Sequence, residues 1–174
     1  MTEDGPTARR AAAGDAAAFD RLVRLHQSRL RGFLLRLTGG RHALADDLAQ
    51  ETFLEAWRKI GTFRGDGSFA GWLLRIGWSR FLMQRRGRKW EALEDSDIGS
   101  ADPRQGHAEQ MDLERAMARL APAERAALTL CHALGYSHAE AAAILAMPLG
   151  TLKSHALRGR EKLQMLMTDG PHDG

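Results

Sequence analysis

Apolar residues recur at helical spacing along most of the chain. In the first long segment they fall every three or four positions, at Phe19, Leu22, Val23, Leu30, Phe33, Leu34 and Leu37. This spacing predicts the buried face of one helix. Asp15 is placed to cap its start, and Gly39-Gly40 is placed to end it. Alternating β-branched runs do not occur in the sequence, so an all-α fold is expected.

Two further helices are predicted in the N-terminal half. The second covers about residues 43–60, and its apolar stripe consists of Ala45, Leu48, Ala49, Thr52, Phe53, Ala56, Trp57 and Ile60. A glycine-containing loop, residues 61–67, interrupts the pattern. The third helix begins near Ser68, has Phe69, Trp72, Leu73 and Ile76 as its inner face, and runs into the basic stretch RRGRK at 85–89.

The composition changes at residue 91. The following stretch, EALEDSDIGSADPRQGHAEQ, is polar and mostly acidic and contains glycine and proline, which is typical of a flexible linker. We therefore expect two small helical domains, at 15–90 and 111–168, with a linker at 91–110. Residues 1–14 and 169–174 are expected to be terminal tails.

Helical spacing resumes near His107. Leu113, Ala116, Met117 and Leu120 form one face, and Pro122 suits the first turn of the next helix, which ends at Gly135. Ser137 and Glu140 form a capping-box pattern. A last helix is predicted from Pro148 to about Met167, with an inner face of Leu149, Leu152, Ala156, Leu163 and Leu166. Two helices joined by a tight turn, the second carrying basic residues, indicate a helix-turn-helix.

Charge and cysteine content narrow the possible functions. The formal net charge of +3 and pI of about 9.5 are compatible with nucleic-acid binding. The single cysteine, Cys131, excludes an intrachain disulfide, and no signal-peptide or membrane-spanning run occurs, so a cytoplasmic protein is expected. The sequence has no nucleophile elbow, HExxH or paired metal-ligand motif, so we expect neither an enzyme nor a bound metal or cofactor.

Two outward helix faces are candidates for binding. On the second helix, Asp47, Gln50, Glu51, Leu54 and Arg58 share a face, which is either a docking stripe for another helix or a solvated face with one exposed leucine. On the third helix, Arg75, Trp78, Leu82 and Arg85 share a face, with Arg80 and Phe81 beside them. Such a face suits single-stranded nucleic acid, unless the rings are buried and only the arginines are exposed.

The loop before the third helix and the start of the last helix supply further candidates. The loop from Thr62 to Ser68 has glycines that allow a close approach of the backbone to an extruded base. The last helix carries polar and basic residues off its apolar stripe, namely Thr151, Lys153, Ser154, His155 and Arg158. The N-terminal half of a recognition helix reads the major groove, although a solvated basic face would have the same pattern.

In combination, these segments closely resemble the extracytoplasmic-function sigma factors of the sigma-70 family. The stretch ALADDLAQETFLEAWRKIGTF and the helix SFAGWLLRIGWSRFLMQRR resemble the family's region 2, and the stretch from LAPAERAAL to GTLKSHALRGREKL resembles its region 4. The resemblance covers about residues 15–166. A helix-turn-helix regulator that does not join RNA polymerase is the alternative, but it would not explain DDLAQETFLEAW.

The resemblance implies partners and site residues. Core RNA polymerase would be bound through the β′ clamp helices by Asp47, Gln50, Glu51 and Leu54, and its β flap would contact the C-terminal domain. The promoter −10 element would be bound by Phe63, Arg64, Ser68, Arg75, Trp78, Ser79, Arg85 and Arg86. The −35 element would be bound by Thr151, Lys153, Ser154, His155 and Arg158. An anti-sigma factor is implied as an inhibitory partner.

The chain departs from the family pattern at four positions. Ser79 replaces the usual asparagine of the third helix, and Met83 replaces an aspartate four residues later. Trp78 stands where a small or basic residue is usual, and His155 replaces a common arginine. These differences bear on promoter preference and melting, whereas the core stripes match the fold.

Overall fold

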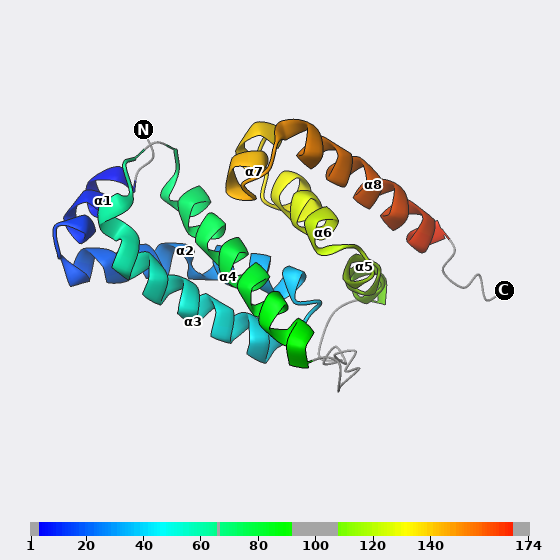
Figure 1. Cartoon of the computed structure of the whole chain (residues 1–174), viewed down its shortest axis with the longest axis horizontal. Coiled ribbons are helices and arrows are strands. Elements are labelled where there is room, and N and C mark those ends of the chain that lie inside the picture. Colours follow the sequence, from blue (N-terminus) through cyan, green and yellow to red (C-terminus); the bar gives the residue numbers. More distant parts are fainter. Residues whose placement is uncertain (1–3, 66, 92–107, 169–174) are drawn as a thin grey trace. The chain divides into compact units, whose positions relative to one another are not determined.

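The computed structural model describes residues 4–65, 67–91 and 108–168, which form helices and turns with no β-strand among them. The chain divides into two compact units. The first is built mainly from α1 to α4 and the second mainly from α5 to α8 (Figure 1). The all-α fold with two small helical units is therefore confirmed. The expected linker, 91–110, and C-terminal tail, 169–174, lie almost entirely outside the described residues.

The long helix α2 (Ala16–Leu37) begins and ends where the sequence predicts. The Asp15 carboxylate accepts a hydrogen bond from the Ala18 N–H at 3.0 Å, and this bond lowers the pKa of Asp15. Gly39 and Gly40 after the helix have positive φ values, which glycine adopts without strain. The inner face of the helix is fully buried at Leu22, Leu30, Phe33, Leu34 and Leu37.

Helices α3 (His42–Lys59) and α4 (Phe69–Glu91) complete the first core, with a short 3-10 turn η1 (Ile60–Thr62) after α3. The Ser68 hydroxyl accepts from the Gly71 N–H at 3.0 Å and so caps α4. Gly77 allows α4 to approach α2, because a Cβ there would lie 3.0 Å from Leu30 Cδ1. The predicted stripe of α3 is wrong at Trp57, which is 39% exposed.

The expected N-terminal tail is also wrong in part, because residues 5–12 form helix α1 (Gly5–Ala12). Ala8 and Ala11 are each 1% exposed, and α1 lies against η1. Arg10 donates to the Asp15 carboxylate at 2.6 Å and thereby joins α1 to the start of α2. An alanine face carries a weak hydrophobic signal, which is why the apolar spacing does not reveal this helix.

The second unit contains α5 (Ala108–Ala118), α6 (Pro122–Leu128), the π-helical turn η2 (Thr129–Ala133), α7 (His138–Ile144) and α8 (Leu149–Thr168). Pro122 lies in the first turn of α6, as predicted. The capping box of α7 is present: Ser137 N–H donates to Glu140 at 2.8 Å, and Glu140 N–H donates to Ser137 Oγ at 3.2 Å. Leu149 and Leu113, expected to face inward, are each 42% exposed.

Helix α8 packs closely on α6 and α7. Gly159 makes this possible, because a Cβ there would lie 3.2 Å from Glu124 Cβ and 3.3 Å from the Glu124 carbonyl oxygen. The turn before α6 is closed by the Arg125 guanidinium, which donates to the carbonyls of Met117, Ala118 and Leu120. The close approach at Gly159 thus brings α8 against α6, and Arg125 closes the turn that leads into α6.

Candidate nucleic-acid interface

An open groove of about 460 Å³ lies between the end of α3 and the outer side of α4. Its lining combines cations, one aromatic ring and small polar groups: Glu55, Lys59, Trp72, Arg75, Ile76, Ser79, Arg80 and Met83. Lys59 and Arg75 are exposed, and Trp72, Ile76 and Arg80 are half-buried. The groove therefore offers positive charge and a ring face to a ligand within a single unit.

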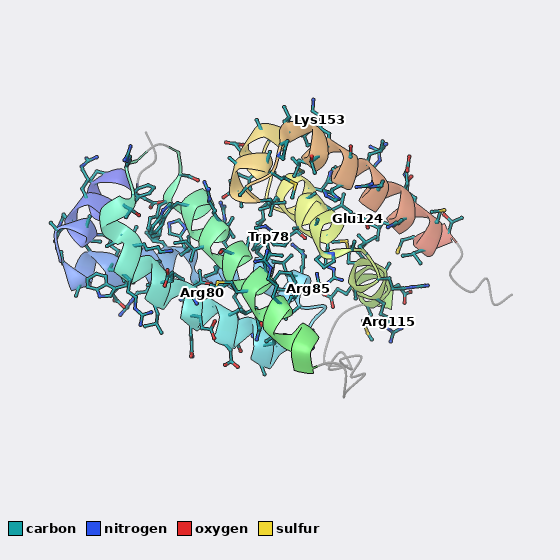
Figure 2. All side chains as sticks on the ribbon, viewed as in Figure 1. Trp78, Arg80, Arg85, Arg115, Glu124 and Lys153 are labelled. Atoms are coloured by element: carbon teal, nitrogen blue, oxygen red, sulfur yellow. The ribbon has the colours of Figure 1, made fainter. Side chains whose placement is uncertain are left out.

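Glu55 organises the cations of the groove. Its carboxylate accepts hydrogen bonds from Lys59 Nζ at 2.7 Å and from Arg80 Nη2 at 2.7 Å, and Arg58 Nη1 lies 3.9 Å away. The hydrogen bonds from Lys59 and Arg80 lower the pKa of Glu55 below its ordinary value. Figure 2 shows Arg80 on the side of α4 that faces α3. The carboxylate thus fixes two cationic side chains from different helices at one edge of the groove.

Only part of the predicted −10 face lines this groove. Arg75 and Ser79 do so, whereas Lys59, Trp72, Arg80 and Met83 were not among the predicted site residues. The positions from Trp72 to Met83 recur three or four residues apart, so helical spacing could have identified this face of α4. Spacing alone could not have placed Lys59 there, because α3 contributes it from another segment.

The aromatic pair of the predicted face is buried. Trp78 is 6% exposed and Phe81 is 4% exposed, and their rings stack with centroids 5.7 Å apart. The guanidinium of Arg85 lies over the Phe81 ring, 5.9 Å from its centroid. Arg85 and Arg86 are exposed. The interpretation with exposed rings is therefore wrong, and Arg75, Arg85 and Arg86 are exposed groups of this predicted face.

The loop before α4 leads into an aromatic cluster, which consists of Phe63, Phe69 and Trp72. The three ring centroids lie 5.5 to 5.7 Å from one another. Phe63 is half-buried, Arg64 is exposed, and Ser68 caps α4. Trp72 belongs both to this cluster and to the groove, so the loop residue Phe63 packs against a side chain that lines the groove.

The predicted −35 residues lie together on the first half of α8. Thr151, Lys153, Ser154 and Arg158 are exposed, and His155 is half-buried. Figure 2 shows Lys153 pointing outward from α8. The Ser154 hydroxyl donates to the Gly150 carbonyl at 3.0 Å, which leaves its oxygen lone pairs as acceptors. This surface matches the part of a recognition helix that enters the major groove.

Arg158 also has partners within the protein. One terminal nitrogen donates to His155 Nδ1 at 3.2 Å, and Nε lies 4.0 Å from the buried Glu124 carboxylate. Lys162 Nζ donates to both Glu124 oxygens at 2.8 and 3.0 Å. Burial tends to raise the pKa of Glu124, but these cations and the Ala121 N–H outweigh it, so the pKa is lowered. Arg158 is consequently held by partners on both α6 and α8.

The predicted polymerase-docking residues form an exposed face of α3. Asp47, Gln50 and Glu51 are exposed, and the Leu54 side chain is 58% exposed. Trp57 lies one turn further along the helix, with its ring centroid 4.9 Å from that of Phe19. The face combines acidic groups with two large exposed apolar side chains, a composition that suits docking of another helix.

Other chemistry is not evident where the structure describes the chain. Among those residues, no three histidine, cysteine, aspartate or glutamate side chains are grouped to hold a metal ion. Burial raises the pKa of the Cys131 thiol, which disfavours the reactive thiolate. No described helix has the length and apolar character required to span a bilayer.

The fold and its surfaces define a two-unit, all-α protein with a cationic groove in one unit and a helix-turn-helix in the other. Residues 22–91 match the family description "Sigma-70 region 2" and residues 110–163 match "Sigma-70, region 4". The chain belongs to the extracytoplasmic-function sigma factors of the sigma-70 family. This membership favours the sigma-factor interpretation over a helix-turn-helix regulator that does not join RNA polymerase.

Curated relatives support this assignment. The chain is 33% identical to the RNA polymerase sigma-H factor of Pseudomonas aeruginosa, with 92% of each chain covered. It is 41% identical to the ECF RNA polymerase sigma factor SigE of Mycolicibacterium smegmatis over 88% of this chain, and spans 64% of that longer relative. It is also 36% identical to the ECF sigma factor SigM of Mycobacterium tuberculosis, over 89% of this chain and 80% of the relative.

Two solved structures share the fold. The sigma factor RpoE of Bartonella quintana, in complex with the anti-sigma factor NepR, superposes with a TM-score of 0.75 at 30% identity, covering 88% of this chain and 98% of RpoE. CnrH, in complex with the cytosolic domain of CnrY, gives a TM-score of 0.74 at 28% identity, covering 97% and 99% of the two chains.

Proposed function

We propose that this chain is the promoter-recognition subunit of an RNA polymerase holoenzyme, and that it acts by binding rather than by catalysis. The groove between α3 and α4 carries this proposal, because it places cations and a tryptophan ring in the unit that matches region 2. Helix α8 would read the −35 element, and the outer face of α3 would dock on the β′ clamp helices.

The groove suits an unpaired strand of the −10 element. The ring of Trp72 can stack on a base, a contact that contributes about 1–3 kcal/mol in single-strand binding proteins. Arg75, Lys59 and Arg80 can hold the flanking phosphates, and the Ser79 hydroxyl can donate to or accept from a base edge. Arg85 and Arg86 would continue the cationic path along α4. We therefore assign strand capture to this groove together with the loop residues Phe63, Arg64 and Ser68.

Helix α8 suits duplex recognition. Lys153 and Arg158 can contact phosphates or guanine edges, and Thr151, Ser154 and His155 can bond to either. Because Glu124 and His155 already orient Arg158, less conformational entropy is lost when it meets DNA. The −35 contacts would hold the promoter while the groove captures the opened strand.

An anti-sigma factor is the proposed inhibitory partner. The support is that two solved relatives, RpoE and CnrH, were each determined in complex with a second protein, named as an anti-sigma factor for RpoE. Such a partner would prevent the α3 face or α8 from reaching the polymerase and the promoter.

Reconstitution with core RNA polymerase tests the proposed function. The full chain should be retained by immobilised core polymerase, and run-off transcription from promoters enriched in polymerase-bound DNA should require its addition. A helix-turn-helix regulator would bind DNA but would neither join the core nor start transcription. Absence of the chain from the reconstituted holoenzyme would refute the proposal.

A further inference from the structure

A partly buried hydrogen bond joins the residue that precedes α1 to helix α2, close to the aromatic cluster. Asp4, which precedes α1, has a side chain only 18% exposed, and His26 of α2 has one 13% exposed. His26 Nε2 lies 2.9 Å from Asp4 Oδ2. A carboxylate can only accept, so the imidazole donates, whether as the neutral Nε2–H tautomer or as the imidazolium. The contact joins residues 22 positions apart in sequence.

His26 leads directly to the aromatic cluster. Its ring centroid lies 5.3 Å from that of Phe69, which is fully buried at the first position of α4. Phe69 contacts Phe63 and Trp72, and Trp72 forms a wall of the groove. Helix α1 also packs against η1, the turn that immediately precedes Phe63. Helix α1 therefore supports both ends of the segment that enters α4.

The Asp4 side chain is not needed for α1 itself. It makes no capping bond to the first turn of α1, and the helix is tied to α2 independently by Arg10 and Asp15. A carboxylate that is 18% exposed and makes no capping bond to its own helix contributes mainly through its partner, His26. This isolates the Asp4–His26 bond as a link between α1 and the cluster.

We infer that Asp4 and His26 are positioning residues for promoter strand capture, which act by fixing the aromatic cluster and thus the Trp72 wall of the groove. This inference rests on the proposed function of the groove. The fixed cluster presents the Trp72 ring at one angle, and that orientation sets which base is accepted. Loss of the bond would leave the unit folded but the wall less strictly oriented.

Amide hydrogen exchange on the whole chain tests whether the Asp4–His26 bond fixes the aromatic cluster. Asp4→Ala should raise exchange at residues 60–65 and 67–72 about tenfold, since a hydrogen bond of this kind shifts a local opening equilibrium by about that factor. Asp4→Asn, whose amide oxygen can still accept from His26, should exchange like wild type. Asp20→Ala, which removes an exposed pair with Arg24, is the matched control. Uniform acceleration across α2 to α4, or no change, would overturn the inference.

Promoter selection tests the functional part. Holoenzymes with each variant would transcribe a promoter library in which the −10 segment is randomised. Asp4→Ala should flatten the sequence preference that wild type selects, whereas Asp4→Asn and Asp20→Ala should keep it. An unchanged −10 sequence preference with Asp4→Ala would refute the positioning role. If wild-type holoenzyme transcribes no member of the library, the proposed function fails instead. The exchange experiment alone then decides whether the Asp4–His26 bond fixes the aromatic cluster.

Discussion

Removal of the Lys162 ammonium should destabilise the second unit through Glu124. The Glu124 side chain is 5% exposed and accepts from Lys162 at 2.8 and 3.0 Å, with the Ala121 N–H as a further donor at 3.1 Å. Lys162→Met keeps most of the aliphatic stem and removes the charge. Glu124 would then be a buried carboxylate whose remaining cationic neighbour, among the described residues, is Arg158, 4.0 Å away.

The expected loss is about 2 kcal/mol. Breaking a fully buried ion pair costs about 3–5 kcal/mol because an unpaired charge remains. Lys162 is itself 47% exposed and Arg158 remains, so the loss should fall near the value for one hydrogen bond to a charged group, about 1.5–3 kcal/mol. Glu124→Gln in the same background should recover much of the stability, since a neutral amide needs no cation and can still accept from Ala121.

The effect should also depend on pH in a defined direction. In wild type the pKa of Glu124 is lowered below 4.5, so its stabilisation is present at neutral pH and is lost as the pH falls through the folded pKa. In Lys162→Met, burial without the ammonium raises the pKa, and the penalty exists only while the carboxylate is charged. The difference between the two proteins should therefore shrink on acidification.

Native-state hydrogen exchange of the α6 and α8 amides measures this difference in the full-length chain. Exchange at residues 16–34 of α2 and 43–59 of α3 serves as an internal control, because those residues lie in the other unit. Equal protection of α6 in wild type and Lys162→Met at neutral pH would refute the reasoning. A destabilisation that persists unchanged at acidic pH would show that lost packing, rather than charge, is responsible.

Three further predictions concern the docking face, the packing of α8 and its DNA contacts. Leu54→Arg should weaken binding to immobilised core polymerase about tenfold without loss of helicity. Leu25→Arg, at another exposed leucine, should leave the affinity unchanged, and equal affinities of the two variants would remove Leu54 from the interface. Gly159→Ala should lower the unfolding free energy by about 1–3 kcal/mol through overpacking, while Gly150→Ala, with open space around it, should raise it slightly in the same denaturation assay. Lys153→Ala should reduce the slope of log affinity against log salt by about one if it contacts a phosphate, and an unchanged slope in promoter titrations would exclude that contact.

Helix boundaries were predictable from the sequence because the interactions that set them are local. Asp15, Ser68 and the Ser137–Glu140 pair each bond to a backbone group within three residues, so the sequence carries both donor and acceptor. The buried face of α2 was also largely predictable, because it follows from the helical period alone. The predicted inner face of α4 is buried at Phe69 and Leu73, but it is wrong at Trp72 and Ile76, which are half-buried and line the open groove.

Burial at the edges of those faces depended on the neighbouring helices. Trp57 satisfies the period of the α3 stripe but lies at its margin, where no helix covers it fully. Trp78 falls on a polar-looking face of α4 yet is buried against Phe81. Helix α1 was not predicted because its buried residues, Ala8 and Ala11, are alanines. Alanine gives only a weak apolar signal in a sequence.

The sequence alone predicts the helices other than α1, several of their caps, the two-part organisation and the family. The tertiary structure decided which outward side chains share a site: it brought Lys59 and Glu55 of α3 to Arg80 of α4, and Lys162 to Glu124. The reason is that helical spacing orders residues only along one helix. The meeting of charges on different helices depends on close approaches, such as that at Gly159, which no periodicity encodes.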